Sequence, residues 1–215
     1  GRVLIDGEDI VGRRERDMGP LRQRFGMIFQ GGGMLQSLTV GQNVALPLVE
    51  LCGYKPGDAM TIVREKLKIV GLEGREDQMP GTLSGGQRKR AAIARALCTK
   101  ADCFLFDEPT AGLDPIMSEN IDEVILATNR STNATTIVVT HDLISVFTLA
   151  QRVFMLWEGR IIFDGTVEEF RNSTHPQVRE FLARDHPETT PVSVSSMNVS
   201  RLAADAVPSP PTRRA

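Results

Sequence analysis

Short apolar runs alternate with segments of helical periodicity along most of this 215-residue chain, and this alternation constrains its fold more than any other feature. Each run is a few residues long and is bounded by polar or turn-forming residues, which is typical of buried strands. We expect strands at residues 2–6, 25–29, 103–106, 135–140 and 153–157, with helices at residues 115–129 and 142–150. Strands that alternate with helices predict an α/β fold with a mainly parallel sheet, covered by helices on both faces.

The stretch at residues 39–97 carries helical patterns instead, and we interpret it as an insertion between two parts of the α/β core. Thr39 and Gln42 have the spacing of a capping box before an apolar run, which predicts a helix start. Further helices are expected at residues 56–70 and 87–97 with a loop at 81–86, and at residues 167–171 and 176–184 after a hairpin.

This pattern divides the chain into four segments. They are a first part of the core at residues 1–37, a helical subdomain at 38–100, a second part of the core at 101–184 and a tail at 185–215. The tail is rich in Ser, Thr, Pro and Ala, so we expect it to be disordered. The first strand begins almost at residue 1 without a preceding turn or cap, so we expect the chain to start inside a domain.

Composition excludes some classes of function. A formal net charge of −2 provides no basic surface for nucleic acid. No apolar run reaches the length of a membrane span, and no signal peptide opens the chain. Cys52, Cys98 and Cys103 lack metal-ligand spacing, so we expect reduced thiols in a cytosolic protein.

Two acids, Asp107 and Glu108, follow the apolar run at residues 103–106. Parallel α/β sheets bind ligands at the carboxyl ends of their strands. There, Asp107 would reach a magnesium ion through water, and Glu108 would polarise a water for attack on a phosphoryl group. The simpler interpretation is a solvated strand end, and the dipeptide alone favours it.

The sequence Ser84-Gly85-Gly86-Gln87 precedes one of the predicted helices. Ser84 and Gln87 have capping-box spacing, so a helix start explains them. Gly85 and Gly86 leave the first turn without side chains, which suits a bulky anion that approaches the backbone N–H groups. The basic residues at 88–90 either attract such an anion or form a solvated face.

Polar residues also follow two other predicted strands. His141 comes after residues 135–140, so it could meet the two acids and contact a terminal phosphate or its attacking water. Asp142 next to it is explained as a helix N-cap. Gln30 ends the strand at residues 25–29 and could bind magnesium or water through its amide oxygen, or be an ordinary polar strand end.

Together these motifs resemble those of the nucleotide-binding subunit of ABC transporters. The matches, in the family's order and spacing, are Gln30 to the Q-loop, residues 83–87 to the signature motif, 103–108 to Walker B, 111–114 to the D-loop and His141 to the switch histidine. The resemblance covers residues 1–184. It implies a P-loop NTPase (RecA-like) fold and an ATPase, with ATP and Mg²⁺ as cofactors, coupled to transmembrane transport.

The resemblance also assigns roles to residues. Catalytic roles fall to Glu108, His141 and Gln30, magnesium binding to Asp107 and Gln30, and nucleotide binding to Ser84, Gly85, Gly86, Gln87 and Asp114. Without the resemblance, Asp114 is explained as a helix N-cap before Pro115. In the family, two subunits face head to tail, and the signature motif of one binds the ATP held by the other.

One family motif is absent from the sequence. The phosphate-binding loop G-x-x-x-x-G-K-[ST] does not occur, and no Gly-Lys pair is found anywhere. The family's adenine-stacking aromatic is absent too. We expect the chain to begin downstream of this loop, with the first strands and the P-loop helix missing; a degenerate protein is the alternative. The 215-residue chain alone should therefore bind ATP poorly and hydrolyse it negligibly.

A finer resemblance concerns the transported substrate. Residues 22–48 and 175–182 are similar to the ATPases of Mce/Mla-type phospholipid transporters of Gram-negative bacteria. This resemblance implies a subunit on the cytoplasmic side, peripheral to the inner membrane. Its implied partners are a transmembrane permease, a second copy of the ATPase and an Mce-domain lipid-binding protein.

The apolar segment at residues 31–51 follows Gln30 and is expected to dock the permease. Three alternatives remain: the ATPase of an importer for amino acids or another small solute, a non-transport ABC protein acting on ribosomes or DNA, and a pseudo-ATPase without catalysis.

Overall fold

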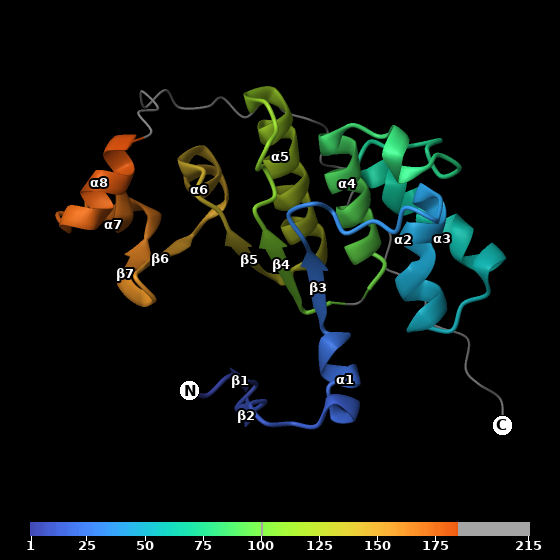
Figure 1. The fold of residues 1–215 in the computed structure, drawn as a ribbon, viewed down its shortest axis with the longest axis horizontal. Coiled ribbons are helices and arrows are strands. Elements are labelled where there is room, and N and C mark those ends of the chain that lie inside the picture. The colour runs from blue at the N-terminus through green and yellow to red at the C-terminus, as the bar shows by residue number, and fades with distance from the viewer. Residues whose placement is uncertain (100, 185–215) are drawn as a thin grey trace.

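A three-stranded parallel sheet with the strand order β3-β4-β5 lies at the centre of the molecule. The computed structural model describes residues 1–99 and 101–184, so the predicted tail at 185–215 lies outside the described residues. The strands are β3 (Phe25–Ile28), β4 (Cys103–Asp107) and β5 (Thr135–Val139). Figure 1 shows these strands side by side, with α2, α3 and α4 to one side and β6, β7, α7 and α8 at the opposite end. The predicted parallel core is confirmed.

One face of this sheet is packed and the other is open. Phe104 and Phe106 of β4 are buried in a cluster that includes residues of α4 (Gly85–Ala96) and α5 (Pro115–Thr132). Gly26 of β3 allows this packing, because a Cβ there would lie 2.5 Å from the Phe104 ring. On the other face Ile137 and Val139 are 51% and 60% exposed.

Among the described residues, helices therefore cover only one face of this sheet, as expected for a core without the P-loop helix. These strands are apolar at nearly every position, so their sequences predict two covered faces whether or not the chain supplies a cover for each.

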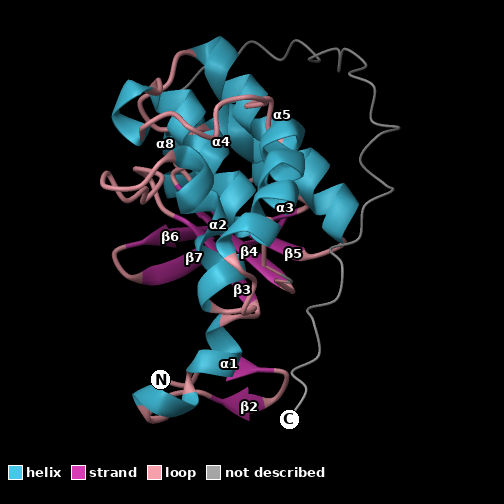
Figure 2. Ribbon diagram, turned by 90° about the vertical axis from the view of Figure 1, so that its right-hand side faces the viewer, coloured by secondary structure: helices cyan, strands magenta, loops and turns pink. Residues whose placement is uncertain are grey.

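The N-terminal segment forms a small hairpin outside the main sheet (Figure 2). The predicted strand at residues 2–6 shortens to β1 (Leu4–Ile5), which pairs antiparallel with β2 (Glu8–Asp9). Asp6 and Gly7 have φ angles of +51° and +84°, which make the tight turn between them. A 3₁₀ turn, η1 (Glu15–Asp17), and the short helix α1 (Gly19–Arg22) then lead into β3.

The stretch predicted to be helical contains α2 (Val40–Glu50), α3 (Pro56–Ile69) and α4, with a 3₁₀ turn, η2 (Pro80–Thr82), before α4. The capping box of Thr39 and Gln42 starts α2 as predicted. The predicted loop at 81–86 is too long, because α4 already begins at Gly85: its N-cap bonds outweigh the low helix propensity of two glycines. Buried apolar residues of all three helices share one core with the central sheet.

The C-terminal part matches its predicted elements closely. After α5 and β5 come α6 (Leu143–Leu149), the antiparallel hairpin of β6 (Arg152–Trp157) and β7 (Arg160–Thr166), α7 (Val167–Arg171) and α8 (Pro176–Arg184). Leu143, Phe170 and Val178 form a second, smaller core beneath this hairpin. Within the described residues, none of the helices combines the length and the apolar composition that a membrane crossing requires.

Candidate functional site

The carboxyl ends of the three parallel strands meet at one edge of the sheet, and polar residues follow each strand there. Asp107 is the last residue of β4 and pairs with Val139 of β5. Glu108 follows Asp107, His141 comes shortly after β5, and Gln30 comes shortly after β3. The structure therefore brings all four predicted residues to the same edge.

Glu108 and His141 are in direct contact. His141 Nδ1 lies 2.9 Å from Glu108 Oε1, and the His141 side chain is 74% exposed whereas that of Glu108 is 20% exposed. The second carboxylate oxygen, Glu108 Oε2, is buried and has no hydrogen-bond partner among the described residues. Buried acceptors are normally satisfied, so this oxygen is suited to bind a molecule that enters the site.

The backbone of Glu108 is held in an uncommon conformation. Its φ angle is +47°, in the left-handed region that few residues other than glycine adopt. The Glu108 amide donates to the Val139 carbonyl at 2.8 Å, and the Glu108 carbonyl accepts from the Ala111 amide at 3.3 Å. Lys89 Nζ also donates to the Glu108 carbonyl at 3.3 Å. Contacts from β5, from the following turn and from α4 thus hold the main chain of Glu108.

A buried cluster of hydroxyls and carboxylates lies behind this edge. Asp122 of α5 accepts a hydrogen bond from Ser145 Oγ, at 3.1 Å and 2.8 Å to its two oxygens. Ser145 Oγ and Thr110 Oγ1 each lie 3.3 Å from Asp142 Oδ2. Burial raises the pKa of Asp122 to about 6, because the charged carboxylate loses its hydration there. The cluster joins the turn after β4 to the start of α6.

The N-terminus of α4 is built by the predicted capping box. Ser84 Oγ accepts from the Gln87 amide at 3.3 Å, and Gln87 Oε1 accepts from the Ser84 amide at 3.0 Å. Gly85 and Gly86 form the first turn. A Cβ at Gly86 would lie 2.4 Å from Met117 Cε of α5, so close helix packing is a second reason for glycine there.

Comparison with known proteins shows the family to which this chain belongs. The sequence profile described as ABC transporter matches residues 1–111, about half of the chain. The chain belongs to the ABC transporter family.

Three relatives illustrate the family's range. The chain is 38% identical over 182 residues to a probable ribonucleotide transport ATP-binding protein, mkl, of Mycobacterium leprae, a match that covers 85% of this chain and 52% of that protein. It is 37% identical to the methionine import ATP-binding protein MetN of Bradyrhizobium diazoefficiens, over 95% of this chain and 59% of that protein. It is also 37% identical to the intermembrane phospholipid transport system ATP-binding protein MlaF of Haemophilus influenzae, over 85% of this chain and 69% of that protein.

Solved structures show the same fold. A dimeric post-hydrolysis state of the ATP-binding cassette MJ0796, bound to ADP and Pi, superposes with a TM-score of 0.70 at 30% identity, covering 78% of this chain and 73% of that one. The structure of cbiO1 from Clostridium perfringens gives a TM-score of 0.71 at 31% identity, covering 86% of this chain and 72% of that one. The chain has the P-loop NTPase fold of ABC cassettes, and it spans just over half the length of the first relatives it matches.

The basic run after the ABC signature motif has neither role considered from the sequence. Arg88 donates to the Leu83 carbonyl at 2.5 Å, and Arg90 donates to the Val70 carbonyl at 3.2 Å. Lys89 lies between them and donates to the Ala111 carbonyl at 2.6 Å. These cations bind main-chain oxygens of their own chain, so they are neither a solvated face nor a free anion-binding patch.

Sequence reasoning did not single out Arg95, whose side chain contacts the loop after Gln30. Its guanidinium donates to the Gly33 carbonyl at 2.6 Å and to the Gly32 carbonyl at 3.0 Å. Gly32 and Gly33 have φ angles of +79° and +56°, so the loop after Gln30 needs both glycines. Burial lowers the pKa of Arg95 by desolvating the guanidinium. The available signal was an arginine on the alanine-rich face of a helix.

The ABC residues expected to bind nucleotide and metal supply suitable groups. Asp114 is the N-cap of α5, where Oδ1 accepts from the Met117 amide at 3.0 Å, and it lies at the exposed start of that helix. Among the described residues, no three His, Cys, Asp or Glu side chains gather into a metal cluster. Asp107 and Gln30 supply a carboxylate and an amide oxygen, the kinds of ligand that would hold a hydrated Mg²⁺ at this edge of the sheet.

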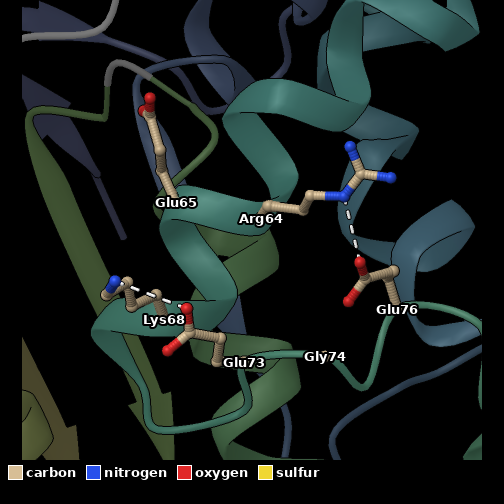
Figure 3. Close-up of a pocket in the computed structure, with 6 residues that line it drawn as sticks. All are labelled: Arg64, Glu65, Lys68, Glu73, Gly74 and Glu76. Carbon is tan, nitrogen blue, oxygen red and sulfur yellow. Dashed lines mark hydrogen bonds and ion pairs between the residues drawn. The ribbon is translucent and has the colours of Figure 1, made fainter.

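A hollow of about 350 Å³ lies elsewhere, along α3 and the segment that follows it (Figure 3). It is lined by Arg64, Glu65, Lys68, Glu73, Gly74 and Glu76. The Arg64 and Glu76 side chains pair at 3.0 Å, and those of Lys68 and Glu73 pair at 3.3 Å. Since both cations bind acids within the hollow, it presents no free positive charge for a phosphate and is not the predicted site.

Proposed function

We propose that this chain is the nucleotide-binding part of an ATPase that powers transmembrane transport. The contact between Glu108 and His141, at the edge where Asp107 ends its strand, carries this proposal. Membership of the ABC transporter family supports it, because the relatives it matches are named as transport ATP-binding proteins. One of the alternatives, a pseudo-ATPase without catalysis, is disfavoured by the contact between Glu108 and His141.

The residues at this edge of the sheet have different roles in the proposed reaction. Bound MgATP supplies the phosphoryl group and the charge of the metal. Glu108 uses its unpartnered Oε2 to orient and deprotonate a water, while the His141 contact fixes Oε1. Asp107 and Gln30 would hold the hydrated metal through their oxygens.

A second copy completes the site in this proposal. The first turn of α4 presents main-chain N–H groups at a positive helix end, and Ser84 adds its hydroxyl. With Gly85, Gly86, Gln87 and Asp114, it would bind the nucleotide held by the other copy of a head-to-tail dimer. The dimeric state of the cassette MJ0796 supports such an arrangement.

The test uses the complete gene product that contains this chain. Glu108→Gln should lower kcat for ATP hydrolysis by about 10²–10⁴-fold, because it removes the general base. Binding of MgATP should persist, since the amide keeps the size of the side chain. Glu123→Gln, on α5, is the matched control and should hydrolyse ATP like the wild type. Equal turnover by wild type and Glu108→Gln would contradict the proposed role.

For the cargo we propose phospholipid, moved between bacterial membranes by a complex with a permease and an Mce-domain protein. The MlaF relative and the similarity of residues 22–48 and 175–182 support this cargo. Import of an amino acid is the alternative, because the MetN relative is equally similar and aligns with more of the chain. If phospholipid stimulates ATP hydrolysis by the reconstituted complex and methionine or ribonucleotides do not, a phospholipid cargo is favoured. Stimulation by methionine or ribonucleotides and not by phospholipid would favour an importer.

The permease contact is proposed at the loop that joins Gln30 to α2, on the cytoplasmic face of the inner membrane. Leu35 is 50% exposed there, whereas Met34 and Val40 are buried. Several apolar residues of the segment at 31–51 belong to the core, so the proposed permease contact is limited to the exposed part of this segment.

Asn43 fixes the shape of this loop. It accepts from the Leu35 amide at 2.7 Å and donates to the Leu35, Leu38 and Thr39 carbonyls at 2.9–3.1 Å. Arg95 holds the glycines on the Gln30 side. A loop fixed at both ends can transmit a displacement between the site and a partner.

A further inference from the structure

Lys89 links the helix α4 to the turn that contains Glu108. It lies in the second turn of α4, and only 6% of its surface is exposed. Its ammonium donates to the Ala111 carbonyl at 2.6 Å and to the Glu108 carbonyl at 3.3 Å. These two acceptors flank the turn after β4, so one cation spans the whole turn.

The surroundings of this cation make the link strong. Burial lowers the pKa of Lys89, while the charge of Glu108 opposes that shift. A buried ammonium is stable only where acceptors satisfy it, so its carbonyl partners are held as firmly as it is. Hydrogen bonds to a charged donor are also stronger than those between neutral groups.

The four cations of α4 differ in what they hold. Arg88 binds the carbonyl just before the helix, Arg90 binds the end of α3, and Arg95 binds the glycines after Gln30. Of these four, Lys89 is the one whose acceptors include the carbonyl of the strained Glu108.

We propose that Lys89 is a positioning residue that holds the Glu108 carboxylate against His141 and ties it to the N-terminal turn of α4. Its side chain points to main-chain oxygens, so it acts through Glu108 and does not touch the nucleotide. A displacement of the Ser84–Gln87 turn is passed to Glu108 through one helical turn and one ammonium group. The catalytic consequence rests on the proposed function, whereas the structural link does not.

The structural test measures amide hydrogen exchange in the 215-residue chain. Lys89→Met keeps the apolar stem and removes the donor, so the amides of Glu108 and Ala111 should exchange about tenfold faster. Arg90→Met removes a comparable bond to the Val70 carbonyl and should leave those two amides unchanged. Unchanged exchange in Lys89→Met, or equal acceleration by both variants, would overturn the proposal. Should Lys89→Met fail to fold, Lys89→Gln replaces it, with a smaller acceleration expected at the same amides.

The catalytic test uses the complete gene product. Lys89→Met should lower kcat about tenfold or more while KM for ATP changes little, because a misplaced general base affects the reaction step and not the binding of substrate. Lys89→Gln, which keeps an amide donor, should recover part of the lost kcat. Arg90→Met should have the kcat of the wild type. A wild type that hydrolyses no ATP would refute the proposed function and leave the exchange result to decide the link. Faster exchange with an unchanged kcat would overturn the positioning role.

Discussion

Glu108 shows how much of a site is decided by contacts that are distant in sequence. The convergence of Asp107, Glu108 and His141 can be predicted, because parallel strands end at one edge and each residue lies at or shortly after the end of a strand. The left-handed backbone of Glu108 cannot be predicted, since a glutamate carries no preference for positive φ. In the folded chain, hydrogen bonds with the Val139 carbonyl, the Ala111 amide and the Lys89 ammonium hold the main chain of Glu108 in place.

A pH prediction belongs to the buried carboxylate of Asp122. Its pKa is raised from 3.8 to about 6 in the folded chain, so the folded state retains the proton where the unfolded state loses it. The free energy of unfolding should therefore fall by about 3 kcal/mol through this group as pH rises from about 4 to about 6. Asp122→Asn should remove this part of the pH dependence.

Urea unfolding of the wild type and Asp122→Asn between pH 4 and pH 7 measures the effect. As pH rises, the free energy of unfolding of the wild type should fall relative to that of Asp122→Asn. Glu123→Gln on the same helix is the control and should leave the pH dependence like that of the wild type. Parallel curves for wild type and Asp122→Asn would refute the assignment.

At the scale of elements, starts of helices are predictable and the partners of their side chains are not. The capping boxes before α2 and α4 are local patterns, and both form. The roles of Lys89 and Arg95 were missed because the carbonyl oxygens that they bind are 19 to 63 residues away in the chain. A basic run on a helix is the same in sequence whether it meets water or main-chain oxygens.

The loop before α2 carries a prediction about coupling. Leu35→Glu should leave basal ATP hydrolysis of the complete gene product near the wild-type value and abolish its stimulation by the permease complex, because a charge in an apolar contact loses hydration. Leu4→Glu is the matched control, since Leu4 is also 50% exposed but lies on the N-terminal hairpin. Reconstituted transport and ATPase assays measure both effects, and coupled transport by Leu35→Glu at the wild-type rate would remove the docking proposal.

At the scale of the whole molecule, order and type of the elements follow from the sequence, while coverage of the sheet does not. Alternating periodicity predicts the strands β3, β4 and β5 and their parallel pairing. Met27, Ile137 and Val139 have the apolar character of buried residues, yet all three are exposed. Apolar residues on a strand indicate that a sheet face is suited to burial, but the sequence does not show whether another segment packs against that face.

The whole chain also carries a prediction about nucleotide binding. The sequence G-x-x-x-x-G-K-[ST] does not occur in the 215 residues, so the chain alone should bind ATP only weakly, with a Kd on the order of 1 mM or above. Titration calorimetry measures binding, and phosphate release measures hydrolysis, with Glu108→Gln as the control for contaminating ATPases. Turnover above roughly 1 per second that Glu108→Gln abolishes would contradict the prediction.

The open sheet face has a practical consequence for handling the protein. Exposed apolar side chains on adjacent strands attract one another between molecules, and the unpaired edges of such strands add backbone hydrogen bonds. At high concentration this chain will therefore tend to aggregate and to bind fluorescent dyes that recognise exposed apolar surface. Dilute samples with a mild detergent are the conditions under which its chemistry is best measured.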